Sequence, residues 1–227
     1  MTEIYLIRHC EAQGNVLRQL QGVTDALVSD LGKKQLEALS ERFENVKLDA
    51  VYSSPLLRAY ETACAVADNK GIEVTKVDGL IELDCGVLEA KPFAEIFAEG
   101  TELGDIWYNH PQHFEPENGE KMKDAYERIW ETVLTLVKQN NGKTIAAASH
   151  GGVLRCLLCR LLYNDINKLS SVGWSDNTAV TLLRFDDDFN PTIVYHSDYS
   201  HLTDDLLSNN SRLSVILRST NNDNNVG

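Results

Sequence analysis

Two arginines and two histidines stand where short apolar runs of the sequence end. Arg8 and His9 close the run EIYLIRH, Arg58 follows AVYSSPLL, and His150 follows TIAAAS. Guanidinium groups pair with phosphate oxygens in a bidentate manner, and an imidazolium ring adds a further hydrogen-bond donor. If the fold brings these four side chains together, they form a binding site for a tetrahedral dianion.

The elements that would position these side chains alternate between strands and helices. The runs typical of strands, mostly separated by segments of helical period, are EIYLIR, LDAVYSS, IEVTKV, KTIAAAS, TAVTLLRF and PTIVYHS. This alternation predicts an α/β fold, a three-layer α/β/α sandwich with a mostly parallel mixed sheet. A short acidic turn joins the last two runs, so we expect one antiparallel edge strand. In such a sheet the carboxyl ends of the strands lie along one edge, where ligands bind.

Two turns from strand to helix would add to the site. In SHGGVLR, Gly151 and Gly152 let the backbone approach a ligand closely, and the following helix offers free amides and its positive dipole end. In SSPLLR, Ser54 is the expected N-cap and Pro55 the first helical residue. Arg58 would then lie in the first helical turn, near the strand ends.

The net charge limits the kinds of partner that the protein can bind. The chain has 227 residues, 43% of them hydrophobic, and a formal net charge of −13. This charge repels nucleic acid and anionic membranes, so we expect neither as a partner. An anionic substrate then needs a local cationic pocket. The sequence makes no prediction about the oligomeric state.

Cysteine usage and apolar runs indicate the compartment. The five cysteines are an odd number scattered through a chain too long to need disulfide bonds, so we expect them reduced. No apolar run approaches the ~20 residues of a membrane span. The start MTEIYLIRH lacks the zones of a secretory signal, so we expect a cytoplasmic location.

We expect one domain over residues 1–218, followed by a disordered polar tail at 219–227. One helix is expected after Ser29, a plausible N-cap followed by leucines at helical spacing. Residues of about 85–118 show weak periodicity, three prolines and two histidines. We expect this segment to be an insertion that covers the carboxyl edge of the sheet.

Taken together, four stretches resemble the histidine phosphatase superfamily, also called the phosphoglycerate mutase-like family. They are LIRHCEAQGN, YSSPLLRAYETA, GLIELDCGVLEA and SHGGVLR, in this order. The resemblance implies a phosphohistidine intermediate on His9 and phosphate ligation by Arg8, Arg58 and His150 with help from Asn15. It also implies that the carboxyl group of Glu82 donates a proton to the leaving oxygen.

The chain departs from the family pattern at three positions. Cys10 and Ala90 stand where the family usually has glycine, and Lys121 stands where it usually has serine. Contacts to the leaving group are expected from the insertion and from residues such as Gln21, Arg18 and Tyr108. The departures affect substrate detail rather than the phosphate pocket.

Two other enzymes share single stretches with this chain. Cysteine-dependent phosphatases use the pattern HC-x5-R, but here Val16 occupies the arginine position and the nearest arginine is Arg18. Zinc deaminases combine H-x-E with P-C-x-x-C, which HCE and CLLC resemble, but Arg155 replaces the proline. Cys156 and Cys159 also lie in an apolar helical run, which favours packing over metal ligation. We therefore expect Cys10 to fill the pocket wall.

The residues suggest a mechanism that needs no metal ion and no cofactor. Positive neighbours favour the neutral, nucleophilic form of His9, while protonated His150 would help hold the phosphoryl oxygens. Asp84 and Glu89 are rivals of Glu82 as the proton donor.

The sequence also bears on the choice of reaction. A mutase needs a closed lid with extra basic residues. Residues 86–119 contain one lysine, Lys91, and no arginine. We therefore expect a phosphomonoester hydrolase that acts on a small phosphorylated metabolite. The alternatives are a phosphoglycerate mutase and a non-catalytic module that binds phosphate esters.

Overall fold

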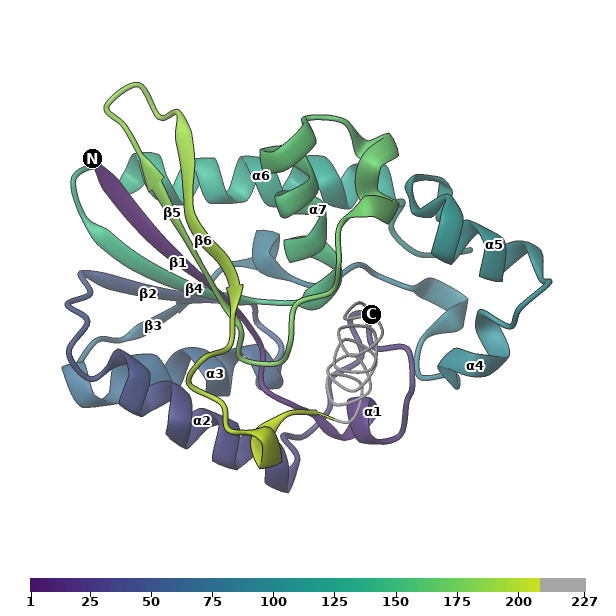
Figure 1. The fold of residues 1–227 in the computed structure, drawn as a ribbon, viewed down its shortest axis with the longest axis horizontal. Helices are drawn as coiled ribbons and strands as arrows, with labels where there is room; N and C mark the ends of the chain where they lie inside the picture. The colour runs from purple at the N-terminus through teal and green to yellow at the C-terminus, as the bar shows by residue number, and fades with distance from the viewer. Residues whose placement is uncertain (209–227) are drawn as a thin grey trace, which may run out of the picture.

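A six-stranded mixed sheet forms the centre of the computed structural model, which describes residues 1–208 (Figure 1). The order of the strands in the sheet is β3-β2-β4-β1-β5-β6. The strands are β1 (Thr2–Arg8), β2 (Ala50–Ser53), β3 (Val74–Lys76), β4 (Thr144–Ser149), β5 (Val180–Phe185) and β6 (Pro191–Asp198). Each of them lies within, or within one residue of, a run that the sequence predicts as a strand.

The sheet is parallel on one side and antiparallel on the other. β1, β2, β3 and β4 pair in parallel, whereas β5 runs against β1, and β6 runs against β5. The predicted antiparallel edge is thus confirmed, and it takes the form of a hairpin. Within this hairpin, β5 is the strand that opposes the parallel set.

Helices cover both faces of the sheet, as predicted for a three-layer sandwich. In Figure 1, α6 and α7 lie on one face, and α2 and α3 lie on the other. The α-helices are α1 (Gln13–Val16), α2 (Asp30–Phe43), α3 (Leu57–Ala67), α4 (Phe93–Ile96), α5 (Glu102–Asn109), α6 (Met122–Gln139) and α7 (Gly151–Tyr163). Short 3₁₀ helices span Asp68–Lys70, Asp78–Leu80, Gly86–Leu88, Pro111–His113, Ile166–Ser171 and Asp204–Leu206.

Alternation along the strands produces a separate core on each face. On β1, Ile4 and Leu6 pack in the cluster that contains the buried residues of α6 and α7, while Ile7 packs in the cluster of α2 and α3. On β4, Ile145 and Ala147 pack in the first of these clusters, and the alanines that follow each of them pack in the second. Because successive side chains of a strand point to opposite faces, this central pair of strands is buried on both sides.

The capping predictions have mixed outcomes. Ser29 is the N-cap of α2, and its side chain accepts a hydrogen bond from Gly32 N at 2.9 Å, as expected. The N-cap of α3 is Leu56, not Ser54, so the helix begins two residues later than the sequence predicts. The Ser54 hydroxyl instead lies 2.7 Å from His150 Nε2. A long-range contact outside the local pattern thus determines the role of Ser54.

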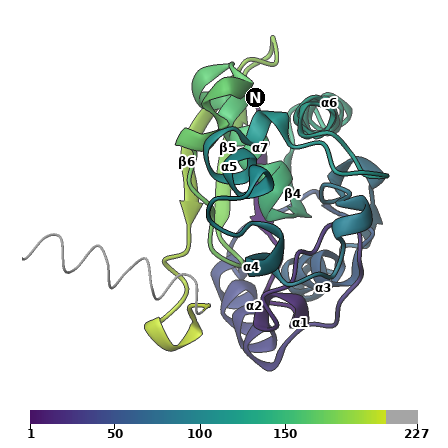
Figure 2. The same cartoon turned by 90° about the vertical axis from the view of Figure 1, so that its right-hand side faces the viewer.

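Residues 85–118 form short helices packed around an aromatic cluster. α4 and α5 lie beyond the ends toward which the parallel strands run, and they face the viewer in Figure 2. Trp107 of α5 stacks on Phe97 with ring centroids 4.3 Å apart and on Trp174 at 5.9 Å. The predicted polar tail, 219–227, lies outside the described residues. Within residues 1–208, no helix is both long enough and apolar enough to cross a membrane.

Candidate active site

The two histidines leave neighbouring strands side by side. β1 and β4 are parallel, and Arg8 pairs with Ser149 in the register of this ladder. The next residues, His9 and His150, therefore emerge together at the carboxyl edge of the sheet. Their rings are both buried, with centroids 5.2 Å apart. The sheet register thus joins two motifs that are far apart in the sequence.

The hydrogen bonding of His9 fixes its tautomer. Its Nδ1 lies 2.6 Å from the carbonyl oxygen of Cys10, which can only accept, so Nδ1 carries the proton. Burial lowers the pKa of the ring well below its ordinary value, and the charges of Arg58 and Arg8 lower it further; the bond to Cys10 opposes this shift. His9 is therefore neutral, with the lone pair of Nε2 available for attack.

His150 is neutral in the same way. Burial lowers its pKa well below the ordinary value, and the charges of Arg58, His9 and Arg8 act in the same direction. The expected protonated form of His150 concerns the site with a phosphoryl group bound, where the charge of the dianion favours the protonated ring. The Ser54 hydroxyl accepts from Leu56 N at 3.3 Å and can donate to His150 Nε2, which leaves the ring proton on Nδ1.

The two arginines approach the histidines from different elements. Arg58, in the first turn of α3, is fully buried and donates from Nη1 to Thr24 O at 2.9 Å and from Nη2 to Gly22 O at 2.8 Å. Arg8, at the end of β1, donates from Nη1 to Ser175 O. Burial lowers the pKa of both guanidinium groups, but the Glu82 carboxylate opposes this, and both stay cationic.

Three buried nitrogens of this group have no hydrogen-bond partner among residues 1–208. They are Arg8 Nε, Arg58 Nε and His150 Nδ1. Buried polar atoms in folded proteins are almost always paired, so three unpaired nitrogens in one place are unusual. Two of them belong to cations, and the third carries the ring proton when the Ser54 hydroxyl donates to Nε2. Together they suit an anion with several acceptor oxygens.

The side chain of Glu82 contacts the N-terminus of α7, the helix that begins directly after His150. Its carboxylate accepts hydrogen bonds from Gly152 N at 2.8 Å and Val153 N at 3.1 Å, and also from Leu83 N at 2.9 Å. The side chain is almost buried, with 9% of its surface exposed. The positive end of the α7 dipole therefore holds a carboxylate next to the two histidines and the two arginines.

The two rival carboxylates are occupied elsewhere. Asp84 accepts from Gly86 N at 2.9 Å and stabilises its own turn. Glu89 accepts from Val23 N at 3.0 Å, in a loop far away in the sequence, and from Cys85 N at 2.9 Å, four residues before it. Among the three candidates, Glu82 is the carboxylate that contacts the helix after His150.

Gly151 lies directly beside Arg8. A Cβ atom at this glycine would be 3.2 Å from Arg8 Nε and 3.4 Å from Trp174 Cε3, a tight fit. The absence of a side chain thus lets the start of α7 come close to the guanidinium group. The predicted close approach of this backbone to a ligand stays a prediction. The indole of Trp174, which is half exposed, lies next to Gly151.

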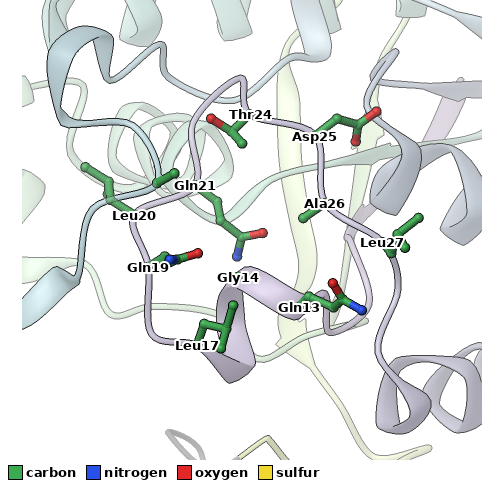
Figure 3. Close-up of a pocket in the computed structure, with 11 residues that line it drawn as sticks. Gln13, Gly14, Leu17, Gln19, Leu20, Gln21, Thr24, Asp25, Ala26 and Leu27 are labelled. Atoms are coloured by element: carbon green, nitrogen blue, oxygen red, sulfur yellow. The ribbon is translucent and has the colours of Figure 1, made fainter.

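Asn15 and Gln21 belong to the neighbouring α1 region. Asn15 Oδ1 accepts from Ala12 N at 3.0 Å and caps α1. Gln21 lines a cavity of about 230 Å³ together with Gly14 and Gln19 (Figure 3), which is below the size of a typical ligand pocket. Their roles in substrate binding stay predictions. Arg18 and Tyr108, two expected contacts of the leaving group, are exposed.

Residues 8 and 9 are also held by a segment in which the sequence predicts no site residue. Residues 173–178, GWSDNT, provide Ser175 O for Arg8, and Asn177 Nδ2 donates to His9 O at 2.9 Å. Thr178 N donates to Arg8 O at 3.1 Å. The polar run before a strand signals a turn, but nothing local in it indicates a contact with residues 8 and 9.

The three cysteines that the sequence motifs single out, Cys10, Cys156 and Cys159, are buried packing residues. Cys10 is fully buried, with its Sγ 3.8 Å from Arg58 O, and burial raises the pKa of its thiol to about 12. Cys156 and Cys159 are buried on α7, and Cys156 Sγ lies 3.4 Å from Met122 Sδ. Within residues 1–208, no group of three or more His, Cys, Asp or Glu side chains could hold a metal ion.

The sequence is similar to those of two bacterial proteins. The chain is 32% identical over 187 residues to phosphoserine phosphatase 1 of Hydrogenobacter thermophilus, covering 82% of this chain and 88% of that protein. It is 30% identical over 162 residues to a probable phosphoglycerate mutase, GpmB, of Yersinia pestis, covering 71% of this chain and 75% of that protein.

Solved structures resemble the fold closely. YhfR of Bacillus stearothermophilus matches with a TM-score of 0.83 and 30% identity, over 88% of this chain and 99% of that one. Phosphoserine phosphatase of Entamoeba histolytica, solved in complex with phosphoserine, matches with a TM-score of 0.78 and 27% identity, over 89% and 100% of the two chains.

The family model named "Histidine phosphatase superfamily (branch 1)" matches residues 4–198, nearly all of the described chain. The family and the enzyme class that the four motifs predict, a phosphatase, are thus confirmed. The chain belongs to the histidine phosphatase superfamily.

Proposed function

We propose that this protein hydrolyses phosphomonoesters of small metabolites through a phosphohistidine intermediate on His9. The observation that carries the proposal is the grouping of a neutral His9, whose Nε2 is free, with three unpaired buried nitrogens on Arg8, Arg58 and His150. A nucleophile next to preorganised donors is the arrangement that phosphoryl transfer requires. The mechanism needs no metal ion, because the arginines supply the positive charge.

In the first step, His9 Nε2 attacks phosphorus while the bond from phosphorus to the ester oxygen breaks. Arg8, Arg58 and His150 hold the equatorial oxygens, whose negative charge favours a proton on His150. Glu82, in its protonated form, gives its proton to the departing oxygen, and the alcohol leaves. His9 then carries the phosphoryl group on Nε2, and its Nδ1–H still donates a hydrogen bond to Cys10 O.

In the second step, water attacks the phosphoryl group of phosphohistidine. The Glu82 carboxylate takes a proton from this water, and the bond between phosphorus and Nε2 breaks. Inorganic phosphate leaves, His9 is again neutral, and Glu82 is again protonated. The same carboxyl group therefore acts first as an acid and then as a base.

The substrate class is supported by the relatives. Two of the similar proteins are phosphoserine phosphatases, so an alkyl phosphate that carries charged groups is the first substrate to test. The mutase alternative is supported by the similarity to GpmB. It is weakened by residues 86–119, where Lys91 is the only basic residue apart from histidines. A cytoplasmic location is supported by the five free cysteines.

Hydrolysis of a panel of phosphate esters tests this function. The panel contains nitrophenyl phosphate, phosphoserine and 3-phosphoglycerate, the last with and without 2,3-bisphosphoglycerate, and inorganic phosphate is measured. We expect phosphate release from nitrophenyl phosphate and from at least one metabolite, and none of it from the His9→Ala variant. Isomerisation of 3-phosphoglycerate without net release would support the mutase. Tight binding without turnover would support the non-catalytic module.

A further inference from the structure

The loop Gly22–Thr24 connects a carboxylate outside the pocket to an arginine inside it. The peptide unit between Gly22 and Val23 has a charged group at each end. Its N–H, on Val23, donates to Glu89 Oε1 at 3.0 Å, and its C=O, on Gly22, accepts from Arg58 Nη2 at 2.8 Å. One rigid peptide plane thus bridges an acid and a base that do not touch each other.

Glu89 holds this loop through several further bonds. Its carboxylate accepts from Gly22 N at 3.2 Å, Thr24 N at 3.1 Å and Thr24 Oγ1 at 2.5 Å. A fifth donor is Cys85 N at 2.9 Å. A carboxylate offers about four lone-pair sites, so this group is saturated with donors. It therefore has no acceptor capacity to spare for a substrate.

The fit between loop and carboxylate is close. A Cβ atom at Gly22 would be 2.1 Å from Glu89 Oε1, so only glycine lets the loop lie this near. Backbone bonds beside it, from Ala90 N to Leu20 O at 3.0 Å and from Leu20 N to Lys91 O at 2.9 Å, fix the same two segments together. These bonds hold residues 20–24 against residues 89–91, and we call the two joined segments the clamp.

We propose that Glu89 is a positioning residue for phosphate binding, acting through the Gly22–Thr24 loop to aim the Arg58 guanidinium at the phosphoryl oxygens. The inference rests on the proposed function, since it takes Arg58 as a phosphate ligand. The Gly22 and Thr24 carbonyls hold both Nη atoms of Arg58, so the loop decides where the unpaired Nε points. The negative charge of Glu89 polarises the bridging peptide and strengthens its bond to the cation.

The protonation of Glu89 agrees with this role. Burial raises the pKa of its carboxyl group, but the hydrogen bonds from Thr24, Cys85 and Val23 outweigh burial and leave the pKa below its ordinary value. Glu89 therefore stays ionised wherever the enzyme is folded near neutral pH. A permanently ionised group suits a positioning role and does not suit a proton donor.

The test compares Glu89→Gln with a matched control, Glu99→Gln, which changes an exposed carboxylate of the same segment. The glutamine keeps the shape, but its NH₂ group faces loop amides that need an acceptor. We expect kcat/KM to fall ~10-fold to 100-fold, the range for losing a charge-assisted hydrogen bond, and tungstate to inhibit more weakly by a similar factor. The loss should be equal for nitrophenyl phosphate and phosphoserine, and the control should match the wild type.

A double-variant cycle shows whether Glu89 acts through Arg58. In the Arg58→Ala background, Glu89→Gln should cause little further loss of tungstate affinity, because the group that it positions is gone. Full additivity of the two losses would overturn the inference. A loss confined to phosphoserine would also overturn it, because it would make Glu89 the proton donor.

Two further outcomes separate the inference from the proposed function. If Arg58→Ala leaves tungstate inhibition unchanged, Arg58 is no phosphate ligand and the proposed site itself fails. If Arg58→Ala weakens inhibition but Glu89→Gln does not, the inference alone fails. Thr24→Val serves if Glu89→Gln does not fold: it removes one hydroxyl donor to Glu89, keeps every backbone bond, and should give a smaller loss in the same direction.

Discussion

Protonation decides between His9 and Cys10, the adjacent residues that could each act as the nucleophile. Burial acts on both, but it raises the pKa of the thiol to about 12 and lowers the pKa of the imidazole. Near neutral pH, the cysteine is therefore an inactive thiol and the histidine a neutral base. The same low-dielectric surroundings thus inactivate one candidate nucleophile and prepare the other.

Replacing Glu82 by glutamine should affect substrates according to their leaving group. A serine alkoxide is strongly basic and needs a proton as it departs, whereas nitrophenolate needs little help. We expect Glu82→Gln to slow the first phosphoryl transfer ~10²-fold to 10⁴-fold for phosphoserine and much less for nitrophenyl phosphate. Rapid-quench measurement of phosphoenzyme formation separates this step from the later attack of water.

Asp84→Asn provides the control, because Asp84 binds its own turn at Gly86 N. It should slow both substrates to a similar and small extent. An equal loss for both substrates in Glu82→Gln would show that Glu82 is not the donor. The search would then move to Asp84, since Glu89 is saturated by backbone amides.

At the scale of elements, local patterns predicted the fold well and the supporting contacts poorly. All six strands and the N-cap at Ser29 follow from periodicity and residue type, which are local properties. The sequence predicts a cap at Ser54, but the helix begins later, and the Ser54 hydroxyl lies near His150, 96 positions away in the sequence. The support from Asn177 and Glu89 was missed for the same reason. Such contacts depend on which segments the fold brings together, and periodicity carries no information about that.

Ala90 gives a prediction about the clamp between residues 20–24 and 89–91. It adopts φ = 58°, in the left-handed region, where a Cβ atom costs ~1–2 kcal/mol and glycine costs nothing. Glycine is also the usual residue of the family here. Ala90→Gly should therefore raise the free energy of unfolding by up to ~1 kcal/mol, after the greater entropy of glycine in the unfolded chain is subtracted.

Urea unfolding of the wild type and Ala90→Gly measures this difference. Ala94→Gly is the matched control, because Ala94 lies in α4 and does not have a positive φ. Glycine should destabilise that position by ~1 kcal/mol. A loss of stability in both variants would show that Ala90 is not strained.

At the scale of the whole molecule, three histidines with lowered pKa values set the response to acid. Burial is the main cause for His9, His150 and His201, and for His201 it lowers the pKa to about 4. Between that value and the ordinary pKa near 6.5, the unfolded chain binds protons that the folded chain does not. The free energy of unfolding must therefore fall as pH decreases through this window.

We expect urea midpoints to decrease from pH 7.5 to pH 5.5, with His9 and His150 each contributing at most ~1.4 kcal/mol per pH unit below 6.5. His201→Gln tests the assignment. The glutamine can accept from Arg42 and donate to Thr178, as the neutral histidine does, but it takes up no proton. The variant should show a shallower dependence on pH. Constant stability over this range, or an unchanged slope in His201→Gln, would contradict the account.

The central claim is that phosphate is transferred to His9, and trapping the phosphoenzyme tests it most directly. Wild type, Cys10→Gly and His9→Ala are mixed with labelled phosphoserine or nitrophenyl phosphate, quenched within milliseconds, and mapped by mass spectrometry. We predict an acid-labile, base-stable phosphoryl group on His9 in the wild type and in Cys10→Gly, and none in His9→Ala. A phosphoryl group on Cys10, or a phosphoenzyme that survives in His9→Ala, would contradict the claim.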